Sequence, residues 1–130
     1  MVDSKKYVNN GIQNGQEIQF LLSEEMNGPK GVPSGKMITD SDEVSFVYLF
    51  EDQDIYEPIH FTQAVWPLMV KALQEKAEPM LVWQDKAVPL KGFLDELQML
   101  IYNIEGNGNY GEEFTSAVEE AFSVILQSAE

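Results

Sequence analysis

The sequence predicts an α+β fold: a mainly antiparallel sheet, a meander of about five to six strands, covered by three helices, the last two forming a helical hairpin. Three observations support this prediction. A hairpin dipeptide lies near the N-terminus, apolar runs of strand length follow it, and from residue 63 the apolar spacing changes from two to about 3.6 residues. With 130 residues, 44% of them hydrophobic, the chain suffices for one packed core, and we expect a single domain spanning residues 1–130.

The first part of the chain is predicted to form a hairpin followed by a loop. Asn14-Gly15 tolerates the positive φ angles of a tight turn, and the flanking residues alternate in polarity, so two strands are expected within residues 5–22. Residues 28–35 then combine three glycines and two prolines, which neither a helix nor a central strand accepts. They are predicted to form a flexible loop.

The middle of the chain is predicted to form consecutive antiparallel strands. Apolar and aromatic residues fill 44–50, as is typical of a buried strand, and residues 55–61 return as its partner. A shorter strand at 36–39 precedes them. The connections are two acidic turns, Asp40-Ser41-Asp42-Glu43 and Glu51-Asp52-Gln53-Asp54.

The first helix is predicted to begin after Thr62, a candidate N-cap. Pro67 lies in its first turn, where a proline removes at most about one hydrogen bond and favours a 3₁₀-like start. Beyond this helix, Met80–Trp83 and Val88 on either side of a polar turn predict one more short hairpin. The apolar face of the helix consists of Trp66, Met69, Val70, Leu73 and Ala77.

Two further helices are predicted to close the chain. An apolar stripe begins at Phe93, continues to Ile104 and ends at Gly106, a suitable residue just beyond a helix C-terminus. A second stripe extends from Phe114 to Ile125 and has acidic residues in its first turn, which the helix dipole favours. The connection at 107–110 is short, so we expect the two helices to be antiparallel neighbours.

Composition disfavours several classes of function. The net charge is −14, all eight basic residues are lysines, and none lies between Gly92 and Glu130, so nucleic-acid binding is not expected. The absence of cysteine removes disulfides, thiolate nucleophiles and cysteine-ligated metals. The N-terminus lacks a signal-peptide pattern, and no apolar run reaches the ~18 residues that span a bilayer. We expect a cytoplasmic protein without membrane contact.

Three features of the sequence resemble functional motifs but do not support the corresponding functions. Residues 106–111 match G-x-G-x-x-G but follow a helix, whereas a dinucleotide site needs a preceding strand, so this segment is interpreted as a helix–helix joint. Residues 31–37 resemble a phosphate-binding loop with one residue too few and Met37 at the magnesium-binding position. His60 is the single histidine and is interpreted as a hydrogen-bonded strand residue. No cofactor is predicted.

The leading hypothesis is a non-enzymatic protein-binding or adaptor protein. Its candidate interaction surface consists of Asp40, Asp42, Asn107, Asn109 and Tyr110, because tyrosine anchors interfaces at low entropic cost. One alternative is a carboxylate-dependent hydrolase or weak cation-binding protein that uses Asp40, Asp42 and Glu105. Another is an acidic mimic of nucleic acid formed by the last two helices. The sequence favours no particular oligomeric state.

Several segments also resemble a known family. They are residues 35–42, Phe46-Val47-Tyr48, Val65-Trp66, and residues 97–113, in which Asn103–Glu113 is the most specific part. Over about residues 35–125 the chain resembles the YjbL-like family of small acidic proteins from Bacillus-like Firmicutes, a family of unknown function. The resemblance implies a cytoplasmic protein of a Firmicute. It supplies no activity, cofactor or catalytic residue.

Overall fold

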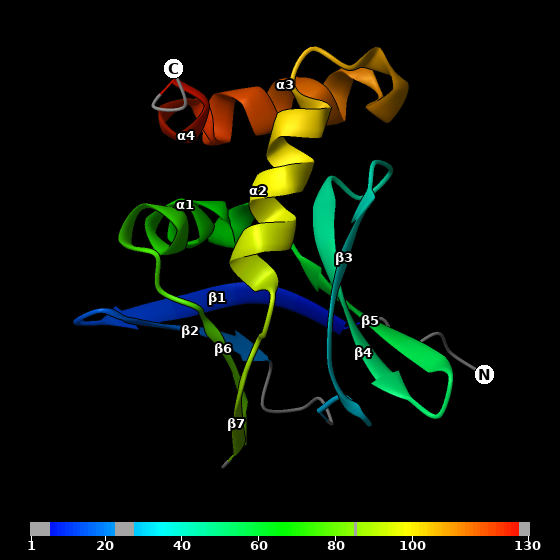
Figure 1. Ribbon diagram of the computed structural model, residues 1–130, viewed down its shortest axis with the longest axis vertical. Helices are drawn as coiled ribbons and strands as arrows, with labels where there is room; N and C mark the ends of the chain where they lie inside the picture. Colours follow the sequence, from blue (N-terminus) through cyan, green and yellow to red (C-terminus); the bar gives the residue numbers. More distant parts are fainter. Residues whose placement is uncertain (1–5, 23–27, 85, 128–130) are drawn as a thin grey trace.

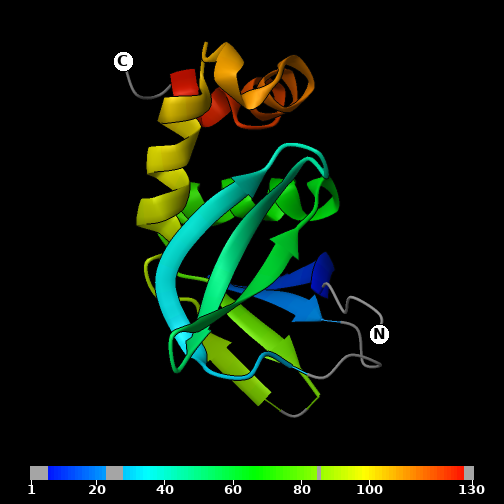
Figure 2. The ribbon, with the colours of Figure 1, turned by 90° about the vertical axis from the view of Figure 1, so that its right-hand side faces the viewer.

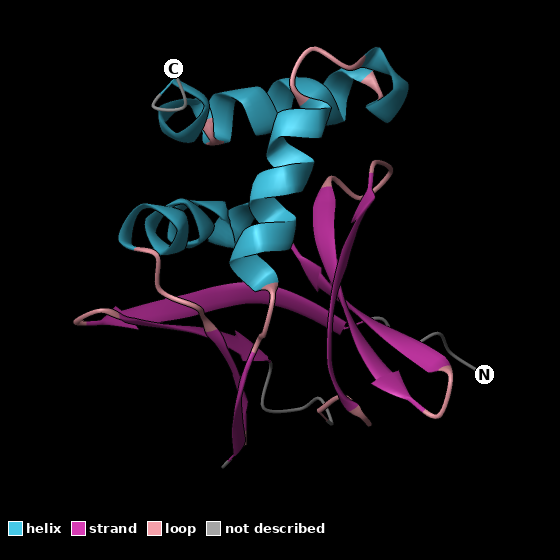
Figure 3. Ribbon diagram, in the orientation of Figure 1, coloured by secondary structure: helices cyan, strands magenta, loops and turns pink. Residues whose placement is uncertain are grey.

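The computed structural model describes residues 6–22, 28–84 and 86–127. They form a curled, mixed sheet of seven strands with the helices packed against one side of it (Figures 1 and 3). The strands are β1 (Lys6–Asn14), β2 (Glu17–Leu22), β3 (Val32–Asp40), β4 (Ser45–Asp52), β5 (Ile55–Phe61), β6 (Met80–Trp83) and β7 (Lys86–Pro89). The helices are the 3₁₀ turns η1 (Gln63–Val65) and η2 (Gly108–Tyr110), and α1 (Trp66–Glu75), α2 (Phe93–Ile104), α3 (Glu112–Ala121) and α4 (Ser123–Gln127).

The strand order is β3-β4-β5-β1-β2-β6-β7. Two of the pairings, β1 with β5 and β2 with β6, are parallel, and the other four are antiparallel. The mainly antiparallel α+β fold predicted from the sequence is thus confirmed, with a slightly larger number of strands. The N-terminal hairpin occupies the centre of the sheet, between the β3–β5 meander and the β6–β7 hairpin.

The N-terminal hairpin has its turn one residue later than the predicted dipeptide. Asn14 pairs with Glu17 across the ladder, so Gly15 and Gln16 form the loop. Gly15 has a φ of 64°, which glycine adopts without a steric penalty. Alternation of buried and exposed residues along β2 then directs Ile18, Phe20 and Leu22 into the core.

The predicted loop at residues 28–35 is wrong in its second half, because β3 begins at Val32. Three features let a strand accept proline here. β3 is the edge strand of the sheet, its register shifts between Pro33 and Lys36, and the hydroxyl of Ser34 donates to the carbonyl of Leu49 at 2.6 Å. The bulge and the side-chain hydrogen bond compensate for the ladder bonds that Pro33 does not form.

The helical segments follow the predicted pattern with two differences. The first helix has the expected 3₁₀ start at η1, but the hydroxyl of Thr62 makes no capping bond. It faces β1 instead, 2.7 Å from Asn9 Oδ1 and 3.2 Å from the carbonyl of Val8. α2 ends as predicted, with Gly106 at a φ of 69°. The last predicted helix is interrupted at Phe122 and forms α3 and α4. α3 runs across the end of α2 (Figure 1) and is not antiparallel to it.

The core lies between the concave face of the sheet and the helices, and its centre is aromatic. The ring of Phe46 in β4 has its centroid 5.2 Å from Trp66, 5.8 Å from Phe114 and 5.7 Å from Phe122. All four side chains are buried. These contacts fix α1 and α3 relative to β4, and they add to the hydrophobic stabilisation of the core.

Candidate functional site

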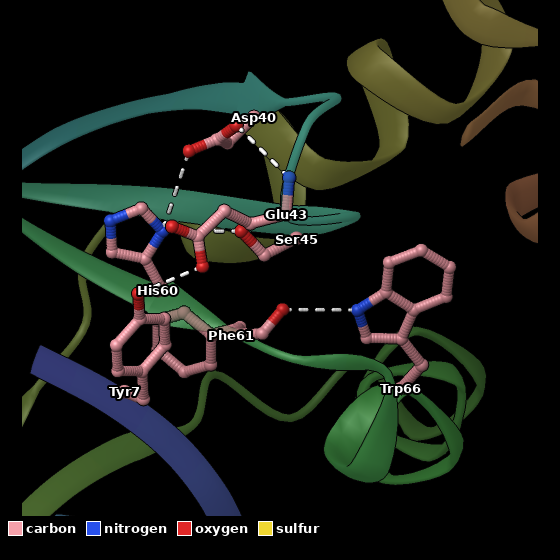
Figure 4. A network of polar contacts seen from close by, with 7 residues as sticks. All are labelled: Tyr7, Asp40, Glu43, Ser45, His60, Phe61 and Trp66. Carbon is pink, nitrogen blue, oxygen red and sulfur yellow. Dashed lines mark hydrogen bonds and ion pairs between the residues drawn. The ribbon is translucent and has the colours of Figure 1, made fainter. Parts of the chain in front are cut away.

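A polar network surrounds His60 on the face of the sheet that is opposite the core (Figure 4). His60 and Ser45 are 4% and 0% exposed, and the Ser45 hydroxyl oxygen lies 3.2 Å from His60 Nδ1. Asp40 Oδ2 lies 4.0 Å from the same nitrogen. The ring of Tyr7 is tilted against the imidazole with its centroid 5.1 Å away, and its hydroxyl donates to Glu43 at 2.8 Å. The network therefore joins β1, β3, β4 and β5.

A strained turn positions the acidic members of this network. Val44, between Glu43 and Ser45, has a φ of 50°, which is rare for a β-branched residue. The backbone N–H of Glu43 donates to Asp40 Oδ1 at 3.3 Å, and the side chain of Val44 packs against the core. These contacts hold the turn in a conformation that brings Glu43 over Tyr7.

The network does not have the geometry of a Ser-His-Asp triad. In a triad the serine and the aspartate bind different nitrogens of the imidazole. Here Ser45 and Asp40 approach the same nitrogen, and Ser45 has no exposed surface for a substrate to reach. The sequence-based interpretation of His60 as a hydrogen-bonded strand residue agrees with its contact to Ser45. Within the described ranges, no group of three or more histidine, aspartate or glutamate side chains is arranged to hold a metal ion.

The predicted site residues of the helix–helix joint are held by hydrogen bonds within the joint. Asn107 Oδ1 accepts from the backbone N–H of Asn109 at 3.0 Å, and Asn107 Nδ2 donates to the carbonyl of Asn103 at 3.3 Å. The ring of Tyr110 is half-buried, with its centroid 6.3 Å from that of Phe114. Asn107 and Tyr110 thus have structural roles, whereas the side chain of Asn109 is exposed.

The two halves of the predicted interaction surface lie at the same end of the molecule (Figures 1 and 2). The β3–β4 turn carries Asp40 and Asp42, and η2 carries Asn109 and Tyr110. Packed aromatic rings connect the two segments through the core, because Phe46 follows the turn and contacts Phe114 at the start of α3. The sequence predicted Asp40 as a site residue but missed its neighbours Tyr7, Glu43, Ser45 and His60. The registers of β1 with β5, β3 with β4 and β4 with β5 bring the strand residues together, and Glu43 lies in the adjoining turn.

A groove of about 720 Å³ lies between α1, α2 and α4. It is lined by Leu73, Gln74, Lys76, Leu94, Asp95, Gln98, Tyr102, Val124 and Ile125. Tyr102 is 37% exposed and Val124 is 45% exposed, so large apolar side chains form part of its accessible wall. None of Asp40, Asp42 and Glu105 belongs to this lining. The groove could not be predicted from the sequence, because its residues come from three separate segments.

The charges in the lining of the groove are balanced, whereas the chain from Gly92 onward is acidic. Lys76, at the C-terminal end of α1, is the basic residue of its lining, and Asp95 in α2 is the acidic one. From Gly92 onward the chain has no basic residue, so the charged residues of α2 and α3 are all acidic, while α4 (SVILQ) carries no charge. Two of these carboxylates accept backbone hydrogen bonds, Glu96 from Met37 and Glu119 from Gly106.

In the part of the chain that the structure describes, no helix is both long and apolar enough to cross a membrane.

Comparison with known proteins identifies the family. A family model described as a family of unknown function (UPF0738) matches residues 6–122. A UPF0738 protein of Lysinibacillus sphaericus is 41% identical over 110 residues, 85% of this chain and 87% of the relative. The UPF0738 protein YjbL of Bacillus subtilis is 34% identical over 113 residues, 87% and 93% of the two chains. A UPF0738 protein of Shouchella clausii is 32% identical over 123 residues, 91% and 99% of the two chains.

No solved structure matches the chain. The resemblance to the YjbL-like family is confirmed by these relatives, and it extends over the first strands, where the sequence alone showed less of it. The relatives also share the assignment to a family without an established activity. The chain belongs to UPF0738, a family of unknown function.

Proposed function

We propose that the protein is a non-enzymatic, cytoplasmic binding protein that docks a partner in the groove between α1, α2 and α4. The observation that carries this proposal is the exposure of large apolar side chains along the groove. Tyr102 and Val124 form part of its wall, and Met99, 48% exposed, lies on the same face of α2 as Tyr102. Clustered exposed apolar residues with a polar rim mark interaction sites on proteins.

The polar residues of the groove support binding rather than catalysis. Gln74 and Gln98 supply hydrogen-bonding groups at its rim, and Asp95 is one of the two charged groups in the lining. A general acid–base or nucleophilic site requires a reactive group and its partner within reach of one substrate. The one such constellation that we recognise among the described residues surrounds His60, and its Ser45 is inaccessible.

The end of the molecule formed by the β3–β4 turn and η2 is a second candidate surface. It carries the residues that the sequence suggested, Asp40, Asp42, Asn107, Asn109 and Tyr110, and their common location favours it. Asn109 is exposed and Tyr110 is half-buried on Phe114, so this surface offers less accessible apolar area than the groove. We therefore place the principal contact at the groove.

Site-specific photo-crosslinking in the source cells tests the proposal. The photoreactive amino acid p-benzoylphenylalanine replaces Tyr102 in the groove, and a matched control carries it at Tyr56, a β5 tyrosine that is 40% exposed and does not line the groove. We expect one defined protein to be crosslinked from position 102 and not from position 56. After purification this protein should bind the wild type and lose affinity for Val124→Asp. Equal crosslinking patterns at both positions would contradict the proposal.

A further inference from the structure

We infer that the occupant of the groove is a basic amphipathic helix of a partner protein, with apolar residues on one face and lysine or arginine on the other. This inference rests on the proposed function and specifies the chemistry of the partner. Three properties of the described structure lead to it: the open apolar wall of the groove, the charge of the elements around it, and the way the edge strand β3 is covered.

The open wall favours a macromolecular occupant over a small molecule. Sites for small ligands enclose most of the ligand surface, typically ~70–90% of it. In this groove Tyr102 and Val124 remain 37% and 45% exposed, so a small ligand would keep much of its own surface in water. A helix docked in the groove between α1, α2 and α4 can contact the apolar and the polar lining residues together.

Charge complementarity specifies a basic partner. The whole chain has a net charge of −14, and the segment from Gly92 onward, which supplies two of the three lining helices, has no basic residue. Asp95 lies in the groove itself. A second copy of this chain would be repelled by the same charge, whereas a cationic helix would be attracted at long range and held beside Asp95. Lys76 is the one lining residue whose charge would repel a cation.

Strand addition, the main alternative for peptide binding, is disfavoured at the edge strand next to α2. The backbone N–H of Met37 in β3 donates to Glu96 Oε1 of α2 at 3.2 Å, and the N–H of Gly35 donates to the hydroxyl of Tyr48 at 3.1 Å. An incoming strand needs such groups to be available. Their engagement disfavours strand addition at β3, the edge of the sheet that lies against α2.

The experiment uses the purified full chain and three fluorescent peptides of ~16 residues, long enough to form about four helical turns. The first has leucine at i, i+3, i+4 and i+7 positions and lysine elsewhere on the helix. The second replaces every lysine by glutamate. The third has the composition of the first in a scrambled order that destroys the apolar stripe. Fluorescence anisotropy gives their affinities, and NMR chemical-shift changes locate the bound peptide.

We expect the first peptide to bind in the groove at least about tenfold more tightly than either of the other two, a difference of ~1.4 kcal/mol. Val124→Asp and Tyr102→Ala should each weaken its binding at least about fivefold, because they remove exposed apolar contacts. Two charge variants should act in opposite directions. Asp95→Lys should weaken binding several-fold, and Lys76→Asn, which keeps a residue that tolerates the left-handed conformation at φ 54°, should strengthen it.

Ile55→Asp, at a residue that is 70% exposed in β5 and outside the groove lining, is the matched control and should leave the affinity within about twofold. Equal binding of the glutamate peptide would overturn the inferred charge, and equal binding of the scrambled peptide, insensitive to Val124→Asp, would overturn the inferred helix. A defined crosslinked partner at position 102 combined with no binding of the lysine peptide would overturn this inference while leaving the proposed function intact. The absence of both would contradict both proposals.

Discussion

The hydroxyl of Tyr48 donates a hydrogen bond to the carbonyl oxygen of Lys91, 43 positions further along the chain, at 2.7 Å. The same hydroxyl accepts the backbone N–H of Gly35 at 3.1 Å. Tyr48 has no exposed surface, and its ring stacks on Phe93, the first residue of α2, with centroids 6.2 Å apart. One side chain thus joins β3, β4 and the start of α2.

Tyr48→Phe should lower the free energy of unfolding by about 1–3 kcal/mol, because it leaves the carbonyl of Lys91 and the N–H of Gly35 without this partner. Urea unfolding followed by tryptophan fluorescence measures the change. The matched control is Tyr102→Phe, at a tyrosine that is 37% exposed, which should change the stability by less than about 0.5 kcal/mol. Equal effects of the two substitutions would show that the Tyr48 hydroxyl does not connect these elements.

Stability should fall in alkaline solution as Tyr48 is forced to ionise. Burial raises the pKa of Tyr48 from 10.0 to about 12, although the hydrogen bond from the N–H of Gly35 favours the ionised form. Because the folded pKa is the higher one, the contribution to stability is complete below pH 10 and is lost as the pH rises towards 12. Urea midpoints measured across this range should decline more steeply for the wild type than for Tyr48→Phe. Parallel declines would contradict this assignment.

Glu96→Ala should open the edge of β3. The carboxylate of Glu96 accepts the backbone N–H of Met37 at 3.2 Å, and its removal should cost about 1–2 kcal/mol. Hydrogen exchange measured by NMR should show faster exchange of the Met37 amide, and light scattering should show association at high protein concentration because the edge is exposed. Glu96→Gln retains an oxygen acceptor and should remain closer to the wild type. Unchanged exchange at Met37 in the alanine variant would be inconsistent with the protection of the edge.

Asn107 and Asn109 should behave differently although they are neighbours in the joint. Asn107→Ala removes two hydrogen bonds, to Asn109 and Asn103, and should cost about 1 kcal/mol of stability. Asn109→Ala removes an exposed side chain and should change stability by less than about 0.5 kcal/mol. Thermal unfolding distinguishes the two. If a partner binds this end of the molecule, Asn109→Ala should weaken that binding without changing stability. Such a result would show that Asn109 acts at the surface and not in the joint.

Ser45 should not react with fluorophosphonate probes that modify serine nucleophiles. Its hydroxyl lies near His60, but the residue is 0% exposed. Intact-protein mass spectrometry after prolonged incubation should show no adduct on the folded chain, and peptide mapping would locate any that formed. A stoichiometric adduct on Ser45, absent from Ser45→Ala, would contradict the inaccessibility of Ser45 and the non-enzymatic proposal.

The sequence predicts an element well when the apolar pattern that defines it lies entirely within that element. The run of apolar residues at 44–50 predicted β4 within a residue or two at each end, and the stripe from Phe93 to Gly106 predicted α2 and its end. The break at Phe122 carries no such signal. No glycine or proline marks it, and the apolar stripe continues through it, while the ring of Phe122 is buried against Phe46 and Trp66. Tertiary packing accompanies the interruption that the pattern does not show.

The candidate sites were predictable only in part, for a similar reason. Asp40 was noticed because it lies in an acidic turn, but its proximity to His60 depends on which residues of β3, β4 and β5 face each other. Tyr102 and Val124 belong to helices whose apolar stripes were recognised, yet their exposure follows from how α2 and α4 are placed against α1. Neither relation is encoded in the spacing of residues along one segment.

The central position of the N-terminal hairpin has a consequence for synthesis on the ribosome. β1 and β2 emerge first, but their outer partners are β5, paired through Lys6 and Ile59, and β6, paired through Gln19 and Met80. Until those later strands have been translated, both long edges of the hairpin are available to foreign strands. The nascent chain therefore passes through an interval in which premature release or crowding with other unfinished chains would favour misassembly, and slowing translation before β6 should lengthen it.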